Sequence, residues 1–263
     1  MPPDSSSFTA LNIPPSAVPE WMGSFTLAAP PNTDLWRKPP SRDTSTAPIL
    51  YTALRNPFIA AEVTVSADWE LEWDQGGLVI FAGAPPGRIG GSAAQTGTAA
   101  ATSTTAGVGV VAAAAAVVGA AAAAQGDAPP AYVPPAPASK WVKVGLEFCN
   151  NACHATSVCA TADGADWALT ALPPHHARRL DLRVKIERIG YALWIWYEDE
   201  VSGWKKLREV TWFFWGVEDK AVRVGVYASR PANFGTTQYE RRHGGPSVTQ
   251  RNLCVDFEGL EIF

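Results

Sequence analysis

The sequence predicts an all-β fold, a sandwich of two antiparallel sheets interrupted by a disordered insertion. Short segments in which apolar and polar residues alternate recur along most of the chain, as strands with one buried face require. Turn-forming residues separate these segments at short intervals. Outside the insertion, no stretch carries the apolar period of a helix of normal length, and about eleven such strands favour a sandwich.

The N-terminal region is the least regular part of this prediction. The first 48 residues are rich in proline and serine, and hold or border apolar islands at 24–29, 33–36 and 49–54. The first island alternates, which predicts a strand, and the repeated prolines exclude a helix because each removes a backbone donor. We predict a flexible segment over residues 1–19 and a single domain over 20–263.

Strand-like segments dominate the chain from residue 61 onward. Alternation divides residues 141–148 between two faces, one with Val142, Val144, Leu146 and Phe148, the other with Trp141, Lys143, Gly145 and Glu147. Further strands are predicted at 62–67, 77–82, 157–161, 167–170, 181–189, 191–198, 222–229 and 253–263, with one or two more within 204–215. Each sheet is therefore expected to have one core face and one face in water.

A low-complexity insertion over about residues 84–139 consists almost entirely of Ala, Gly, Thr, Ser and Pro. Such residues bury too little area to offset chain entropy, which predicts disorder. Residues 108–124 are apolar, but alanine adds little transfer energy and no basic or aromatic anchors flank them, so we predict no membrane partner. Residues 107–112 match G-x-G-x-x-A without the strand–helix context of a dinucleotide site, and no cofactor is predicted.

Charge and cysteine usage narrow the function classes further. The net charge of −4 and the lack of a basic stripe argue against a nucleic-acid partner. The N-terminus lacks the basic start and apolar run of a secretory signal, so we expect a cytoplasmic protein whose four cysteines are free thiols. Cys149, Cys153 and His154 lack the remaining ligands of a tetrahedral set, and no metal site is predicted.

Four segments fall into a recognisable order. They are Asp74-Gln75-Gly76-Gly77-Leu78, the segment 141–148 (WVKVGLEF), Asp166-Trp167 after Ser157-Val158, and the segment 224–231 (VGVYASRP). The order resembles the regulation-of-enolase family of fungi and bacteria, in which D-Q-x-G-L, W-x-K-x-G-x-E, S-D-W and a G-x-x-A-x-S-P-like strand follow one another. The resemblance covers roughly residues 20–263 without the insertion.

This resemblance implies a concanavalin A-like jelly-roll sandwich in a cytosolic protein with no firmly assigned chemistry. Two departures stand out. About 57 residues separate the D-Q and W-x-K strands, which a short turn joins in the family. Ala165 replaces the serine of the S-D-W triplet, so any role of that hydroxyl is lost here.

We predict a ligand site on one sheet face, formed by Gln75, Lys143, Glu147, Trp194, Trp196, Arg223 and Tyr227. An aromatic floor with a few polar groups suits a sugar ring or another flat ligand. Lys143 and Glu147 share a face about 13 Å apart along the strand, which is too far for a direct pair. The alternative interpretation is a set of ordinary cross-strand pairs on a half-exposed sheet.

The run Glu70-Leu71-Glu72-Trp73-Asp74 raises a glycoside hydrolase alternative, because sandwich glucanases carry alternating acids on a strand. Acids two apart on a strand lie about 6.6 Å apart, a plausible separation for a retaining pair. The order differs from E-x-D-x-x-E and the last glutamate is missing. Simple solvation of the acids is the other interpretation.

The leading hypothesis is a cytosolic ligand-binding or regulatory β-sandwich in carbohydrate or central metabolism. Its partner would be a small polar metabolite or a metabolic enzyme, bound through one sheet face. The alternative is an enzyme of lyase, isomerase or cyclase type that uses Lys143, Glu147 and Tyr227 as acid, base and orienting groups. A third hypothesis gives the insertion an interaction role.

Overall fold

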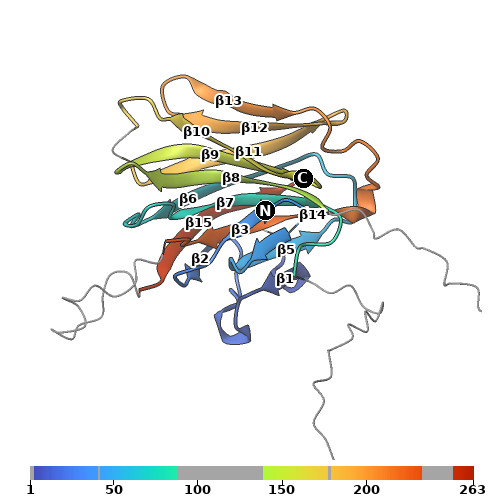
Figure 1. The fold of residues 1–263 in the computed structure, drawn as a ribbon, viewed down its shortest axis with the longest axis horizontal. Coiled ribbons are helices and arrows are strands. Elements are labelled where there is room, and N and C mark those ends of the chain that lie inside the picture. The colour runs from blue at the N-terminus through green and yellow to red at the C-terminus, as the bar shows by residue number, and fades with distance from the viewer. Residues whose placement is uncertain (1–2, 41, 88–138, 177–178, 233–250) are drawn as a thin grey trace, which may run out of the picture. The chain divides into compact units, whose positions relative to one another are not determined.

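The computed structural model describes residues 3–40, 42–87, 139–176, 179–232 and 251–263 (Figure 1). Two large antiparallel sheets stack face to face, which confirms the predicted sandwich class. The helices of this described part are three short 3-10 turns, η1 (Ser5–Ser7), η2 (Pro15–Ala17) and η3 (Asp219–Ala221). Within it, no helix has the length and apolar character to cross a membrane. The predicted insertion falls almost wholly outside the described residues.

The first sheet has seven strands, all paired with antiparallel neighbours. In spatial order they are β1 (Phe8–Leu11), β5 (Ile49–Ala53), β14 (Val222–Ser229), β7 (Gln75–Ala82), β8 (Lys140–Cys149), β9 (Ala152–Thr161) and β10 (Gly164–Ala171). The central strands β14, β7 and β8 carry three of the four family-like segments, and the fourth lies on β9 and β10, so pairing brings residues distant in sequence side by side.

The second sheet has six strands, again antiparallel. They are β13 (Gly203–Val210), β12 (Ala192–Asp199), β11 (Asp181–Ile189), β6 (Ala60–Ala67), β15 (Leu253–Ile262) and β2 (Ser24–Ala29). A separate hairpin joins β3 (Leu35–Lys38) to β4 (Arg42–Ser45).

The main core lies between the two sheets and follows the alternation in the sequence. Val142, Val144 and Leu146 of β8 point into it and are at most 1% exposed. Val63 and Val65 of β6 meet them from the second sheet, while the intervening residues of β6 are partly exposed. The period of two therefore predicted the inward face of these strands correctly.

The other face of the seven-stranded sheet corrects an expectation, because its middle is not in water. Hairpin β3–β4 covers it and forms a second apolar cluster with the sheet, comprising Leu35, Ala47, Ile49, Tyr51, Val79, Phe81, Trp141, Val158, Ala160 and Tyr227. Both faces of β7 are consequently buried along its whole length. A sheet covered on both sides explains why residues 77–82 read as a continuous apolar run.

Arg37 fastens the hairpin to the sheet. Its guanidinium is bidentate to Asp43 across the hairpin, at 2.8 and 2.7 Å. The same group donates to the carbonyl oxygens of Ser139 and Thr161, at 2.7 and 3.0 Å. Arg37 is only 2% exposed, so these charge-assisted bonds are shielded from water and hold the hairpin in place.

The remaining differences from the sequence prediction concern short elements. Residues 8–11, within the segment expected to be flexible, pair with β5 as the edge strand β1. β4 was not predicted, because Arg42–Ser45 (RDTS) has no apolar alternation. Residues 211–216 form turns rather than a second strand after β13.

Candidate functional site

A pocket of about 490 Å³ opens where hairpin β3–β4 meets the seven-stranded sheet. Its lining comes from the hairpin region, the turn before β7, and strands β7 to β10: Asp34, Trp36, Lys38, Trp73, Gln75, Lys143, Glu147, Val158, Trp167 and Pro231. The volume lies within the range of small-molecule sites, and the lining combines three tryptophans with convergent polar groups.

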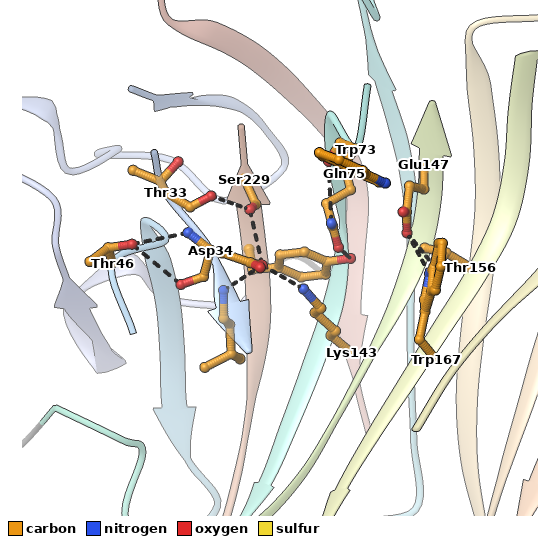
Figure 2. A network of polar contacts seen from close by, with 12 residues as sticks. Thr33, Asp34, Thr46, Trp73, Gln75, Lys143, Glu147, Thr156, Trp167 and Ser229 are labelled. Atoms are coloured by element: carbon orange, nitrogen blue, oxygen red, sulfur yellow. Dashed lines mark hydrogen bonds and ion pairs between the residues drawn. The ribbon is translucent and has the colours of Figure 1, made fainter. Parts of the chain in front are cut away.

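Lys143 is the central cation of this pocket. Alternation on β8 turns its side chain away from the main core, and hairpin β3–β4 covers it, so that it is fully buried. Its amino group lies 2.9 Å from Asp34 Oδ1 (Figure 2). It also lies 5.4 Å from the centre of the Tyr227 ring. An ion pair and an aromatic face together stabilise a charge that burial alone would disfavour.

Asp34 is placed by the base of the hairpin. Its backbone N–H donates to the Thr46 hydroxyl oxygen at 3.0 Å, and its carbonyl oxygen accepts from Thr46 N–H at 2.9 Å. Its Oδ1 also accepts hydrogen bonds from Leu35 N–H at 2.7 Å and from the Ser229 hydroxyl at 3.4 Å. The carboxylate is therefore fixed where the hairpin, β14 and β8 converge (Figure 2).

Gln75 and Tyr227 form a buried pair beneath the pocket. The Tyr227 hydroxyl donates to Gln75 Oε1 at 3.2 Å, and Gln75 Nε2 donates to the Trp73 carbonyl at 3.2 Å. Tyr227 is fully buried, and this burial raises the pKa of its phenol well above the ordinary value. Tyr227 thus stays protonated and orients Gln75, while Gln75 itself lines the pocket.

Glu147 is the buried acid of the site. Its Oε2 accepts hydrogen bonds from the Thr156 hydroxyl at 2.7 Å and from Trp167 Nε1 at 3.2 Å (Figure 2). Desolvation raises the pKa of this carboxyl, while the Thr156 bond, Lys143 and the Trp167 bond act in the opposite direction. Oε1 receives no hydrogen bond from the described residues, which leaves an acceptor for a ligand.

Gly145 lies between Lys143 and Glu147 on the same face of β8. A Cβ atom there would lie 1.8 Å from the carbonyl oxygen of Gly76 on β7. No side chain fits in that space, so β7 and β8 can approach closely only with glycine at this position. The W-x-K-x-G-x-E spacing therefore places two polar side chains with no side chain between them.

Comparison with known proteins identifies the family. A family model described as a protein of unknown function (DUF1349) matches residues 11–243. The chain belongs to this family. An uncharacterized protein of Emericella nidulans, AN7484, is 31% identical over 214 residues, covering 80% of this chain and 79% of that protein. None of these names refers to enolase regulation, so that resemblance stays a prediction.

Solved structures agree with the sandwich fold of this DUF1349 member. A functionally unknown protein from Saccharomyces cerevisiae matches with a TM-score of 0.57 and 17% identity, over 99% of this chain and 98% of that one. A xylan β-1,4-xylosidase from Bacillus halodurans matches with a TM-score of 0.51 and 11% identity. This chain covers 98% of its own length but only 37% of the xylosidase, and the likeness concerns the fold alone.

The structure brings together four of the seven residues predicted for the ligand site. Gln75, Lys143 and Glu147 line the pocket, and Tyr227 lies directly beneath it. Arg223 is on β14 as well, but it donates to the backbone carbonyls of Lys220 and Val222 and does not line the pocket. Arg223 therefore shares the predicted face with Tyr227 but lies outside the pocket, whereas Trp194 and Trp196 are on another sheet.

Trp194 and Trp196 belong to β12 in the six-stranded sheet, on its outer face. Their rings stack with centroids 5.8 Å apart, and Lys206 Nζ lies 4.5 Å from the Trp194 ring centre. Lys185 Nζ lies 5.4 Å from the Trp196 ring. Lysine side chains occupy the ring faces, so these tryptophans form a cation–π cluster separate from the pocket.

Sequence reasoning missed Asp34, Trp36 and Trp73 as pocket residues. Trp167 was quoted only as part of the family-like A-D-W triplet, although its indole N–H bonds Glu147. Asp34 and Trp36 come from the proline-rich region, where alternation is too short to assign a face. The Asp166-Trp167 dipeptide was the available signal, because the resemblance already singled it out.

The acidic run in residues 70–74 is not a strand, which removes the basis of the glucanase comparison. Asp74 is fully buried and bidentate to Arg230, at 2.9 and 2.7 Å. Glu72 accepts a hydrogen bond from Asn150 N–H at 3.1 Å. The acids therefore fix a turn, and they do not face one another across a substrate groove.

The three buried cysteines, Cys149, Cys153 and Cys159, carry no sign of reactivity. All four are free, and burial raises the pKa of Cys153 and Cys159 to about 11. A hydrogen bond to Glu72 raises the pKa of Cys149 to about 11 as well. Across the described ranges, no three potential ligands gather into a metal site. Protonated thiols are poor nucleophiles and poor ligands.

Proposed function

We propose that the chain binds a neutral, hydroxyl-rich ligand of the carbohydrate type in the pocket between hairpin β3–β4 and the seven-stranded sheet. One observation carries the proposal: buried Lys143 and Glu147 meet Asp34 in a pocket that three tryptophans line. Buried charged groups that converge on a cavity favour binding, because their desolvation is offset only when partners satisfy them.

The hydrogen-bonding capacity of the pocket favours a polyol. Glu147 Oε1 and Asp34 Oδ2 receive no hydrogen bond from the described residues and can accept from ligand hydroxyls. Lys143 has three N–H donors and uses one on Asp34, so it can donate to a ligand oxygen. A phosphate or carboxylate would face two carboxyl groups. Of the two lysines in the lining, Lys143 is already neutralised by Asp34, which leaves Lys38 alone to balance an anion.

The tryptophans favour a ligand with flat apolar faces. Trp36, Trp73 and Trp167 reach the pocket from β3, the turn before β7 and β10. A sugar ring presents C–H groups on its faces and hydroxyls at its edge, which matches aromatic walls around polar groups.

We further propose a regulatory role in carbohydrate or central metabolism, carried out in the cytoplasm. Its support is the resemblance of the D-Q-G-G-L and W-x-K-x-G-x-E segments to the regulation-of-enolase family. In this role the pocket senses a metabolite, and a metabolic enzyme is the candidate protein partner. The test is to purify this protein with and without the ligand and to measure how much of a metabolic enzyme co-purifies with it. An amount that changes with the ligand would support this role, and an amount that does not change would oppose it.

An enzyme of lyase, isomerase or cyclase type is the second candidate, and Glu147 is the observation that favours it. A buried acid whose pKa is raised holds its proton to higher pH than an exposed glutamate and can exchange it with a ligand. Tyr227 is a weaker candidate in this scheme, because its hydroxyl is buried and engaged with Gln75. Product analysis with a bound ligand separates the two candidates: turnover that Glu147→Gln abolishes would favour the enzyme.

The direct test is a thermal-shift screen with neutral mono- and oligosaccharides, sugar phosphates and carboxylate metabolites. A ligand at a hundred times its Kd adds about 2.7 kcal/mol, or roughly 5 to 10 °C in a domain of this size. We expect a shift with neutral sugars that Lys143→Met removes. Shifts with phosphorylated compounds alone would contradict the proposed ligand class.

A further inference from the structure

The backbone of Trp73 is unusual in the described part of the chain. Its φ angle is +68°, in the left-handed region that non-glycine residues rarely adopt. The other non-glycine residues with positive φ among the described residues are all asparagines, namely Asn12, Asn32, Asn150 and Asn151. Asparagine tolerates this conformation, whereas a bulky aromatic residue does so only with strain.

The surrounding turn holds Trp73 in this conformation from both sides. Trp73 N–H donates to the Phe148 carbonyl at 2.8 Å, and Phe148 N–H donates to the Asp74 carbonyl at 2.9 Å. The Asp74 carboxylate accepts from Leu71 N–H at 2.9 Å while it is bidentate to buried Arg230. A strained backbone conformation is stable only where the surrounding hydrogen bonds hold it in place, as they do here.

The indole of Trp73 makes no polar contact and no ring contact with the described part of the chain. Trp73 is 45% exposed. Trp69, four residues earlier, shows the contrast: it is 7% exposed and donates to the Leu180 carbonyl at 2.8 Å. A half-exposed indole is thus held at a strained backbone position without a polar or ring partner, and it lines the pocket.

We infer that Trp73 is the residue on which a sugar ring stacks in this pocket. This inference rests on the proposed carbohydrate-type ligand. Gln75 connects the Trp73 backbone to the polar floor, because its amide donates to the Trp73 carbonyl and its oxygen accepts from Tyr227. A ring that stacks on Trp73 would thus turn its edge hydroxyls toward Glu147 and Lys143.

A pair of matched variants tests the strain. At an ordinary exposed position alanine is more stable than glycine, but at positive φ the order is reversed. We expect Trp73→Gly to melt about 2 to 4 °C above Trp73→Ala. An equal or lower melting temperature for Trp73→Gly would overturn the assignment of strain.

The stacking role of Trp73 is tested by measuring the affinity of its variants for the best neutral sugar from the thermal-shift screen. Trp73→Gly and Trp73→Ala should each weaken binding by at least about tenfold, while Trp73→Phe keeps most of the affinity. Binding that is unchanged in Trp73→Gly but lost in Lys143→Met would overturn the role of Trp73 and leave the proposed function intact. Binding that neither substitution weakens would contradict the proposed site itself.

Discussion

Lys143 Nζ and Asp34 Oδ1 lie 2.9 Å apart and join the centre of the seven-stranded sheet to the base of the hairpin that covers it. Lys143 is fully buried, and the Asp34 side chain is 22% exposed on the pocket side. The ion pair thus forms part of both the hairpin attachment and the pocket wall. The proposed binding site depends on this relationship.

Replacement of Lys143 by methionine should lower stability and abolish ligand binding. The substitution keeps most of the side-chain volume but leaves Asp34 without its charged partner, at a cost of about 2 kcal/mol. Chemical denaturation measures the loss. Lys220→Met is the matched control, because Lys220 is exposed and should tolerate the change with little effect.

Glu147→Gln should change the pH dependence of stability. Burial raises the pKa of Glu147 above its ordinary value of 4.5, so the folded state binds this proton more tightly than the unfolded chain. Its stabilising contribution is complete below that value and is lost as the pH rises through the raised pKa. The melting temperature of Glu147→Gln relative to wild type should therefore increase from about pH 4 to about pH 8. A difference in melting temperature between Glu147→Gln and wild type that does not change with pH would contradict the raised pKa of Glu147.

Trp194→Ala should destabilise the protein without affecting the pocket. The variant loses its stacking on Trp196 and its contact with Lys206, which together contribute about 1 to 2 kcal/mol. Ligand affinity should be unchanged, because Trp194 lies on the outer face of the other sheet. If Trp194→Ala bound the ligand more weakly while keeping normal stability, Trp194 would be part of the binding site after all.

Arg230→Met should be among the most destabilising substitutions. It leaves the Asp74 carboxylate fully buried and unpaired, which costs about 3 to 5 kcal/mol. The double variant Arg230→Met with Asp74→Asn should recover part of this loss, because it removes the buried charge. A double-mutant cycle by chemical denaturation with no coupling would contradict the role of this pair.

The sequence allowed accurate prediction of the strands whose inward residues form the main core. β8 is the clearest case, since the burial of Val142, Val144 and Leu146 follows the period of two. The same period placed Lys143 and Glu147 together on the opposite face. Local alternation is sufficient here because each strand buries one face against the other sheet.

The pocket could not be predicted in full, because it depends on pairing between distant segments. Alternation marked Trp194 and Trp196 as sharing a face, but it carries no information about which sheet receives β12. Likewise, Asp34 reaches Lys143 only through the fold of a short hairpin, across 109 residues of sequence. Long-range pairing of this kind leaves no period in the sequence.

The central claim is that the pocket beneath hairpin β3–β4 binds a neutral carbohydrate-type ligand. Isothermal titration calorimetry of the best neutral sugar against wild type, Lys143→Met and Trp194→Ala tests it most directly. The account predicts binding to wild type and Trp194→Ala with equal affinity, and loss of binding in folded Lys143→Met. Equal binding to all three proteins, or loss of binding in Trp194→Ala alone, would contradict it.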